Sequence, residues 1–256
     1  MQIRGFQKTS FVDYPGEICS TVFVGGCNLR CPFCFNRDLV LQPDALPLFR
    51  EEEIFEFLEK RLPVQGALCI SGGEPALQED LSAFLAKAKK TGLKVKLDTN
   101  GTFPEILEQL LEEGNLDYVA VDFKAPPQKY EMLTGGISTD ASKDVYTKLK
   151  QTISLLRGSA LLDSSKNSPK LSSNNPALNY ELRTTVIPTL LDENDLLEMA
   201  QILGGASHLV LQQFQPLPTL LDQSLQDVKP YPKEKIEKVA SFCRQFVGRV
   251  TLRGFN

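Results

Sequence analysis

Apolar and polar residues follow two spacings along the chain. Apolar positions three and four residues apart predict helices in six segments: 51–62, 79–92, 103–114, 143–156, 193–205 and 233–246. Short apolar runs typical of buried strands precede or separate them: 19–24, 67–71, 93–98, 116–124, 180–187 and 208–214. This alternation predicts an α/β fold whose strands form a parallel sheet with right-handed crossovers.

The number of strand–helix pairs decides which α/β fold to expect. The pattern contains about six pairs, fewer than the eight of a closed barrel. We therefore expect a partial (β/α)6 TIM-like barrel, with its active site at the carboxyl ends of the strands. Residues 1–18 predict a small β-rich lead-in with a turn at 13–17. Residues 1–256 are expected to form a single domain.

One segment interrupts the alternation. Residues 158–179 contain six Ser, four Asn and two Pro, and few apolar side chains after Leu162. Such a composition cannot bury enough apolar surface to order itself. We expect a flexible surface insertion between a helix and the next strand.

Composition narrows the class of protein. Of the 256 residues, 42% are hydrophobic and 23% charged, and the net charge is −4, so neither nucleic acid nor membrane is expected as a partner. No apolar run approaches the roughly 18 residues of a membrane span, and the first residues lack the apolar core of a secretion signal. A cytoplasmic protein is expected. A local basic cluster has the pattern of a solvated helix end: Lys87, Lys89, Lys90, Lys94 and Lys96.

Three of the six cysteines stand close together, in "VFVGGCNLRCPFCFN". Cys27, Cys31 and Cys34 follow a predicted strand directly, and in a reducing compartment such a group indicates metal or redox chemistry. The remaining cysteines lie among apolar residues and are expected to be buried structural thiols: Cys19, Cys69 and Cys243.

Three thiols are one fewer than structural zinc or an ordinary iron–sulfur cluster requires. If the loop holds a [4Fe–4S] cluster, one iron keeps an open position for a substrate or cofactor. Zinc would need a fourth ligand from elsewhere, with Asp38 the nearest carboxylate. The single histidine, His208, lies in an apolar strand context and is expected to pack or form hydrogen bonds. Structural zinc and unligated thiols remain alternatives.

Later strands also end in polar residues. The strand at 67–71 runs into "GGEP", where Gly72 and Gly73 allow backbone carbonyls to approach a ligand. Asp98 and Asp122 each stand at the end of a strand. Lys124 falls on the same face as Asp122, because strand side chains alternate with period two.

The phrase "CNLRCPFC" resembles the signature of the radical S-adenosylmethionine (SAM) superfamily: three cysteines spaced CxxxCxxC with an aromatic residue, here Phe33, before the last. The resemblance implies that Cys27, Cys31 and Cys34 hold a [4Fe–4S] cluster whose open iron binds SAM. The reduced cluster would cleave SAM to a 5′-deoxyadenosyl radical. The "GGEP" phrase resembles the second family motif, which implies that Gly72, Gly73 and Glu74 hold the methionine end of SAM.

The phrases "DTNG" and "DxK" resemble the activating enzymes of glycyl-radical enzymes. In the pyruvate formate-lyase activating enzymes the matching aspartates hold a monovalent cation beside the SAM carboxylate, which implies such a site at Asp98 and Asp122. The resemblance further implies a face that completes cofactor and substrate binding, with the catalytic positions Asp122 and Lys124 and the SAM or peptide contacts Thr99, Asn100 and Lys124. Phe33 is expected to pack near the adenine or shield the cluster, and Arg183 to lie near the ribose or adenine.

Three longer phrases, "GFQKTSFVDYPGE", "DFKAPPQKYEMLTG" and "LQQFQP", resemble the longer form of anaerobic ribonucleoside-triphosphate reductase activating proteins. This implies a glycyl-radical enzyme as protein partner and a flavodoxin or ferredoxin-type electron donor. One departure is Phe35, where relatives usually have histidine; phenylalanine cannot form the same hydrogen bond near a cluster. A radical SAM enzyme acting on a small molecule or nucleoside, and a non-catalytic metal-binding module, remain alternatives.

Overall fold

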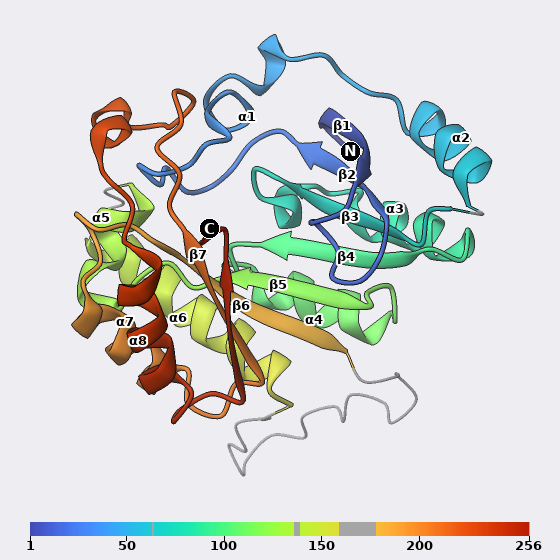
Figure 1. Ribbon diagram of the computed structural model, residues 1–256. Coiled ribbons are helices and arrows are strands. Elements are labelled where there is room, and N and C mark those ends of the chain that lie inside the picture. Colours follow the sequence, from blue (N-terminus) through green and yellow to red (C-terminus); the bar gives the residue numbers. More distant parts are fainter. Residues whose placement is uncertain (63, 136–138, 159–177, 256) are drawn as a thin grey trace. The chain divides into compact units, whose positions relative to one another are not determined.

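The computed structural model describes residues 1–62, 64–135, 139–158 and 178–255 (Figure 1). Its strands are β1 Ile3–Ser10, β2 Cys19–Val24, β3 Ala67–Gly72, β4 Lys94–Thr99, β5 Tyr118–Asp122, β6 Asn179–Val186, β7 His208–Gln213 and β8 Arg249–Arg253. Its α-helices are α1 Arg37–Leu41, α2 Glu51–Arg61, α3 Leu81–Lys90, α4 Pro104–Glu112, α5 Tyr130–Thr134, α6 Thr139–Leu156, α7 Glu193–Ile202 and α8 Lys233–Cys243. Most of the insertion predicted at 158–179 lies outside the described residues.

The strands form one eight-stranded sheet in chain order, from β1 to β8. β1 pairs with β2 antiparallel, which agrees with the predicted β-rich lead-in. The pairs β2–β3, β3–β4, β6–β7 and β7–β8 are parallel. The predicted α/β fold, a partial TIM-like barrel, is confirmed. One strand, β8, was missed: its sequence "RVTLR" has polar residues at three of five positions, and only Val250 is buried.

The chain divides into two compact units, and the first consists mainly of Met1–Asn28 and Asn36–Ala120. Its sheet core contains Val22, Ile70 and Val95, all fully buried. α3 is amphipathic, because its buried residues recur at helical spacing: Leu81, Phe84, Leu85 and Ala88. The ring of Phe84 packs against Phe55 of α2, with centroids 5.2 Å apart.

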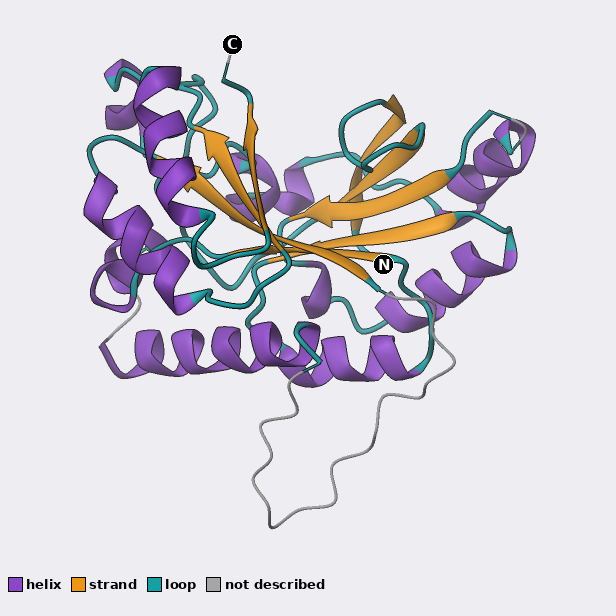
Figure 2. Ribbon diagram, turned by 60° about the horizontal axis from the view of Figure 1, so that its bottom comes forward, coloured by secondary structure: helices purple, strands orange, loops and turns teal. Residues whose placement is uncertain are grey.

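The second unit consists mainly of Leu29–Phe35, Val121–Leu161 and Tyr180–Asn256. α7 begins at a capping box in which Asp192 and Asp195 each accept a hydrogen bond from the other's backbone N–H. α7 and α8 lie side by side in Figure 1 and contact each other. Figure 2 colours the helices purple and the strands orange.

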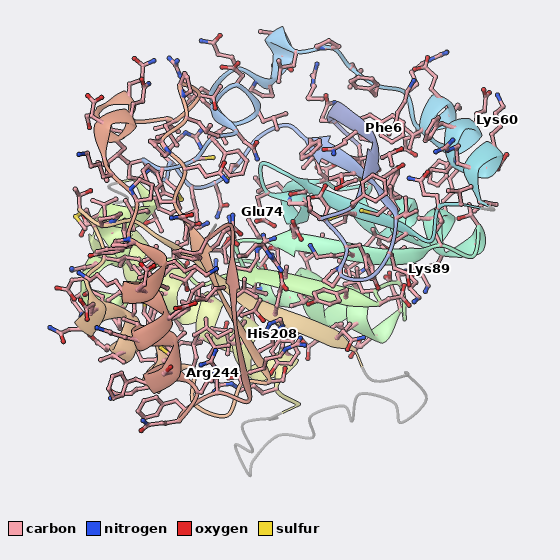
Figure 3. All side chains as sticks on the ribbon, viewed as in Figure 1. Phe6, Lys60, Glu74, Lys89, His208 and Arg244 are labelled. Atoms are coloured by element: carbon pink, nitrogen blue, oxygen red, sulfur yellow. The ribbon has the colours of Figure 1, made fainter. Side chains whose placement is uncertain are left out.

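The predictions for the three cysteines outside the loop and for His208 are confirmed. Cys19, Cys69 and Cys243 are completely buried, and burial raises the pKa of each thiol, that of Cys243 to about 11. His208, the first residue of β7 (Figure 3), accepts or donates hydrogen bonds at both ring nitrogens, 2.9 Å from Thr251 Oγ1 and 2.9 Å from an Arg249 nitrogen. Burial, followed by the Arg249 charge, lowers the pKa of His208.

The prediction of a solvated helix end is wrong in two respects: Lys94 and Lys96 lie in a strand, and Lys96 is not solvated. Lys94 is half exposed and pairs with Glu17, as a solvated lysine would, but Lys96 is only 2% exposed. Both belong to β4 rather than to a helix end. Lys96 tolerates burial because it forms an ion pair with Asp98 inside the first unit. No helix among the described residues is long and apolar enough to span a membrane.

Candidate functional site

The cysteine loop begins in the first unit, directly after β2. Gly25 N donates to Gln2 O at 2.9 Å, and Gly26 N donates to Leu39 O at 2.8 Å. Gly26 has a φ of +86°, a left-handed conformation that residues with a Cβ rarely adopt. These contacts turn the chain sharply and fix the backbone that leads into Cys27.

The Gly-Gly-Glu motif at the end of β3 packs against the start of this loop. Gly73 N donates to Val24 O and Glu74 N donates to Gly26 O, each at 2.9 Å. A Cβ at Gly73 would lie 1.8 Å from Gly26 O, and one at Gly72 would lie 2.4 Å from Val24 N. The glycines therefore permit two backbones to touch, a role that we did not predict from the sequence.

Glu74 connects the ends of two strands (Figure 3). Its side chain is fully buried and accepts hydrogen bonds from Ala76 N at 3.0 Å, Thr99 Oγ1 at 2.7 Å and Asn100 N at 2.7 Å. Bonds to a charged acceptor are strong, so this carboxylate holds the Thr99–Asn100 turn after β4 in one conformation. The contact of Glu74 with SAM remains a prediction.

Three side chains form a closed ring of hydrogen bonds beside Cys27. Asn100 Nδ2 donates to Asn28 Oδ1 at 2.8 Å, Asn28 Nδ2 to Thr102 Oγ1 at 2.8 Å, and Thr102 Oγ1 to Asn100 Oδ1 at 2.7 Å. Asn100 Nδ2 also lies 3.9 Å from Cys27 Sγ. Hydrogen bonds of this kind orient and tune a ligating sulfur. Asn100 was predicted as a SAM or peptide contact. Asn28 and Thr102 were missed, because Asn28 occupies an unspecified position of the CxxxCxxC pattern and Thr102 lies just after "DTNG".

Asp98 lies at the carboxyl end of β4, as predicted. Its carboxylate pairs with the ammonium group of Lys96 and accepts a hydrogen bond from Ser71 Oγ at 3.3 Å. The side chain of Asp98 is 13% exposed. It is therefore a nearly buried carboxylate with a positive charge already beside it.

The rest of the cysteine loop belongs to the second unit. Cys34 N donates to Cys31 O at 3.0 Å, which makes a tight turn around Pro32. Two backbone bonds from a distant segment reach this turn: Leu221 N to Cys34 O and Asp222 N to Pro32 O, each at 2.8 Å.

α5 contacts the same loop just before Cys31. Arg30 N donates to Thr134 O at 2.9 Å. Gly135, which ends α5 with a φ of +96°, is so close that a Cβ would lie 2.3 Å from Arg30 O. The backbone around Cys31 and Cys34 is thus fixed by α5 before Cys31 and by Leu221 and Asp222 after it.

An ionic triad lies at the end of β5 in the second unit. Asp122 pairs with Lys124 Nζ at 3.2 Å and with Arg183 Nε of β6 at 2.9 Å. Lys124 Nζ also lies 5.8 Å from the ring centroid of Phe33, which is 9% exposed. The predicted same-face placement of Asp122 and Lys124 is confirmed, and Phe33 and Arg183 join them.

The triad is ionised at neutral pH. Burial on its own would raise the pKa of Asp122, but the charges of Arg183 and Lys124 outweigh it and lower the pKa to about 2. Burial opposes the charge of Lys124 as well, and the Asp122 carboxylate overcomes it and raises the pKa of that ammonium. A cation that remains charged beside an aromatic ring can bind an anionic group.

The predicted residues fall into two groups, one in each unit. The first unit brings together Cys27, Gly72, Gly73, Glu74, Asp98, Thr99 and Asn100. The second brings together Cys31, Cys34, Phe33, Asp122, Lys124 and Arg183. The described part of the chain contains no ready-made group of three or more His, Cys, Asp or Glu ligands, so the three-cysteine ligand set remains a prediction.

Comparison with known proteins adds independent information. The family model of the "Radical SAM superfamily" matches residues 21–158. A Methanocaldococcus jannaschii protein named "Putative glycyl-radical enzyme activating enzyme" is 30% identical over 99% of this chain and 96% of its own. The pyruvate formate-lyase-activating enzyme of Clostridium pasteurianum is 25% identical over 96% of this chain and 98% of its own.

Among the solved structures with a similar fold is a domain of a pyruvate-formate lyase-activating enzyme from Bacteroides vulgatus. Its TM-score is 0.51 at 13% identity, and the match covers 74% of this chain and 99% of the domain.

The residues present fit two of the expected cofactors. All six cysteines are thiols, and the three in the loop are the soft donors that an iron–sulfur cluster takes. Ser71, Gly72 and Gly73 are half-buried at the end of β3, whose first four residues are fully buried, so acceptors for an ammonium group are accessible there.

The residues present do not fit the third expected group, a monovalent cation. Asp98 already pairs with Lys96, and Asp122 already pairs with Lys124 and Arg183. Each carboxylate that was expected to hold the cation is therefore compensated by a charge from the chain itself.

Proposed function

Because the chain belongs to the radical SAM superfamily, we propose that it cleaves SAM reductively to install a glycyl radical on a partner enzyme. A [4Fe–4S] cluster and SAM are the cofactors that this superfamily implies. The partner enzyme, the glycyl product and the roles of individual residues are part of this proposal.

The observation that carries the proposal is the extent of the similarity. Relatives named as activating enzymes match along nearly the whole of both chains, and the 30% identical protein is one of them. A protein substrate, which is what an activating enzyme acts on, is thus favoured over a small molecule.

Cys27, Cys31 and Cys34 would hold the cluster. When bound, the cluster supplies the electron that breaks a carbon–sulfur bond of SAM. The chain's contribution is to hold the ligands: Asn100 directs its amide toward Cys27 Sγ, and the bonds from Leu221 and Asp222 fix the Cys31–Cys34 turn.

Residues at the ends of β3 and β5, together with Phe33, would orient SAM and the substrate. Acceptors at Ser71, Gly72 and Gly73 suit the ammonium group of SAM, while Lys124 suits an anionic group such as a carboxylate. Arg183 and Asp122 hold Lys124 in place through the ionic triad. Phe33, beside Lys124, offers an apolar face to the adenine or shields the cluster from water.

An anaerobic ribonucleotide reductase is the proposed partner, supported by the phrases "GFQKTSFVDYPGE", "DFKAPPQKYEMLTG" and "LQQFQP". A flavodoxin or ferredoxin-type protein is the proposed electron donor. Phe35 is 54% exposed beside the third cysteine, where a partner protein could contact it.

The test is anaerobic reconstitution with iron and sulfide, followed by reduction in the presence of SAM and the candidate reductase. We expect 5′-deoxyadenosine and a glycine-centred doublet in the electron spin resonance spectrum. Cys31→Ala should abolish both, whereas the matched control Cys19→Ala, at a buried thiol outside the loop, should retain both. Deoxyadenosine formation that never yields a glycyl doublet with any glycyl-radical partner would favour the small-molecule alternative.

A further inference from the structure

Lys96 is the most deeply buried basic side chain near the proposed SAM site. It is 2% exposed, and its ammonium group pairs with Asp98 while lying 3.9 Å from Cys69 Sγ and 5.8 Å from the Tyr118 ring centroid. All of these contacts are within the first unit. A buried ammonium group is costly unless it is paired, so its position depends on the Asp98 carboxylate.

Asp98 is placed by its neighbours in turn. Ser71 Oγ donates to it from β3, and the next two residues, Thr99 and Asn100, are held by Glu74. These contacts hold the carboxylate at the end of β4. A positive charge must remain beside it for the folded state to be stable.

We propose that the Lys96 ammonium is a built-in replacement for a monovalent cation at Asp98, so that this chain binds SAM without Na⁺ or K⁺. The site implied by resemblance to the pyruvate formate-lyase activating enzymes is then absent here. A metal cation approaching Asp98 would meet the ammonium charge, and Ser71 already uses the other carboxylate oxygen. Asp122, compensated by Lys124 and Arg183, offers no alternative place.

Lys96 thus acts as a positioning residue. It compensates the charge of Asp98 and so holds the end of β4 beside the residues that are proposed to bind SAM. The part of the inference that concerns SAM rests on the proposed function; the part that concerns cation dependence of the fold does not.

Thermal unfolding of the full chain without a bound cluster tests whether the stability of the fold depends on a monovalent cation. The midpoint is measured in KCl, NaCl and choline chloride at equal ionic strength. The wild type should unfold at the same temperature, within about 1 °C, in all three salts. Lys96→Met should unfold at a lower temperature in choline and recover by several degrees in KCl or NaCl, because a small cation can then enter beside Asp98.

Two variants separate this from general salt effects. Lys94→Met removes a half-exposed lysine from the same strand and should show no cation-specific recovery. Lys96→Met combined with Asp98→Asn removes the carboxylate as well and should lose the recovery. A wild type that requires Na⁺ or K⁺, or a Lys96→Met protein indifferent to the salt, would overturn the proposal.

If Lys96→Met fails to fold in every salt, SAM binding by the wild type still tests whether a monovalent cation is needed. After reconstitution, its dissociation constant for SAM should agree within about twofold between KCl and choline chloride. A tenfold loss of affinity in choline, corresponding to about 1.4 kcal/mol, would refute the replacement of the cation. Failure to find a glycyl radical on a partner would refute the proposed function and leave both of these measurements interpretable.

Discussion

Glu74→Gln is the substitution that best tests how the site is built. The side chain is fully buried and its two oxygens accept hydrogen bonds from at least three donors, Ala76 N, Thr99 Oγ1 and Asn100 N. Glutamine keeps the size and shape of glutamate. It replaces one oxygen with an NH₂ group, which is a donor facing another donor.

The magnitude follows from these bonds. A bond to a charged acceptor contributes about 1.5–3 kcal/mol and a neutral one about 1 kcal/mol, so weakening two of them costs about 2 kcal/mol. A buried donor left without an acceptor destabilises the fold by about 1–3 kcal/mol more, and removal of a buried charge offsets part of this destabilisation. We expect a net loss of about 3 kcal/mol, a large share of the 5–15 kcal/mol that stabilises most proteins.

Urea unfolding of the chain without cluster measures this loss. With a slope of about 3 kcal/mol/M, the midpoint should fall by about 1 M while the slope stays unchanged. The matched control is Glu113→Gln, since the exposed Glu113 carboxylate also accepts three bonds, from Ser82, Gln109 and Asn115. There the change should be within about 0.5 kcal/mol. Equal midpoint shifts in the two variants would refute the view that buried Glu74 joins the strand ends.

Other substitutions test the cysteine loop and the ionic triad. Gly73→Ala should displace Gly26 O, 1.8 Å from the new Cβ, and lower the iron bound per chain on reconstitution; an unchanged iron content would contradict this. Asp122→Asn should destabilise most at neutral pH. The pKa of Asp122 is lowered to about 2 from 3.8, so its stabilisation is complete above pH 3.8 and is lost toward pH 2. The urea midpoints of variant and wild type should therefore converge over that range, and a constant difference would exclude the triad as the cause.

The sequence predicted most helices well because they bury one apolar face, and most strands because they are continuous apolar runs that the sheet buries. It failed at β8, where the apolar signal is weak, and at Lys96, where the pattern of charges suggested solvent. The burial of Lys96 depends on Asp98, two residues along β4, and on Cys69 from the neighbouring strand. Burial of a charge is a property of its partners in space, which a reading of composition along the chain cannot supply.

The candidate site divides in a similar way. Residues with distinctive chemistry, the cysteines and the carboxylates at strand ends, could be predicted from the sequence because their types and spacing are unusual. Asn28 and Thr102 could not, since their relevance comes only from the ring of hydrogen bonds that brings them to Asn100 and Cys27. The reason for Gly73 also emerged only with the contact to Gly26.

The backbone bonds from Leu221 and Asp222 to the Cys31–Cys34 turn affect when this protein can mature. The turn leaves the ribosome long before the segment that fixes it has been translated. A nascent chain therefore exposes its thiols before their geometry is established. Iron delivered at that stage would meet Cys31 and Cys34 in a turn that is not yet fixed. Productive assembly has to wait until Leu221 and Asp222 have been translated, and a chain shortened before residue 220 would keep Cys27, Cys31 and Cys34 yet never reach that point.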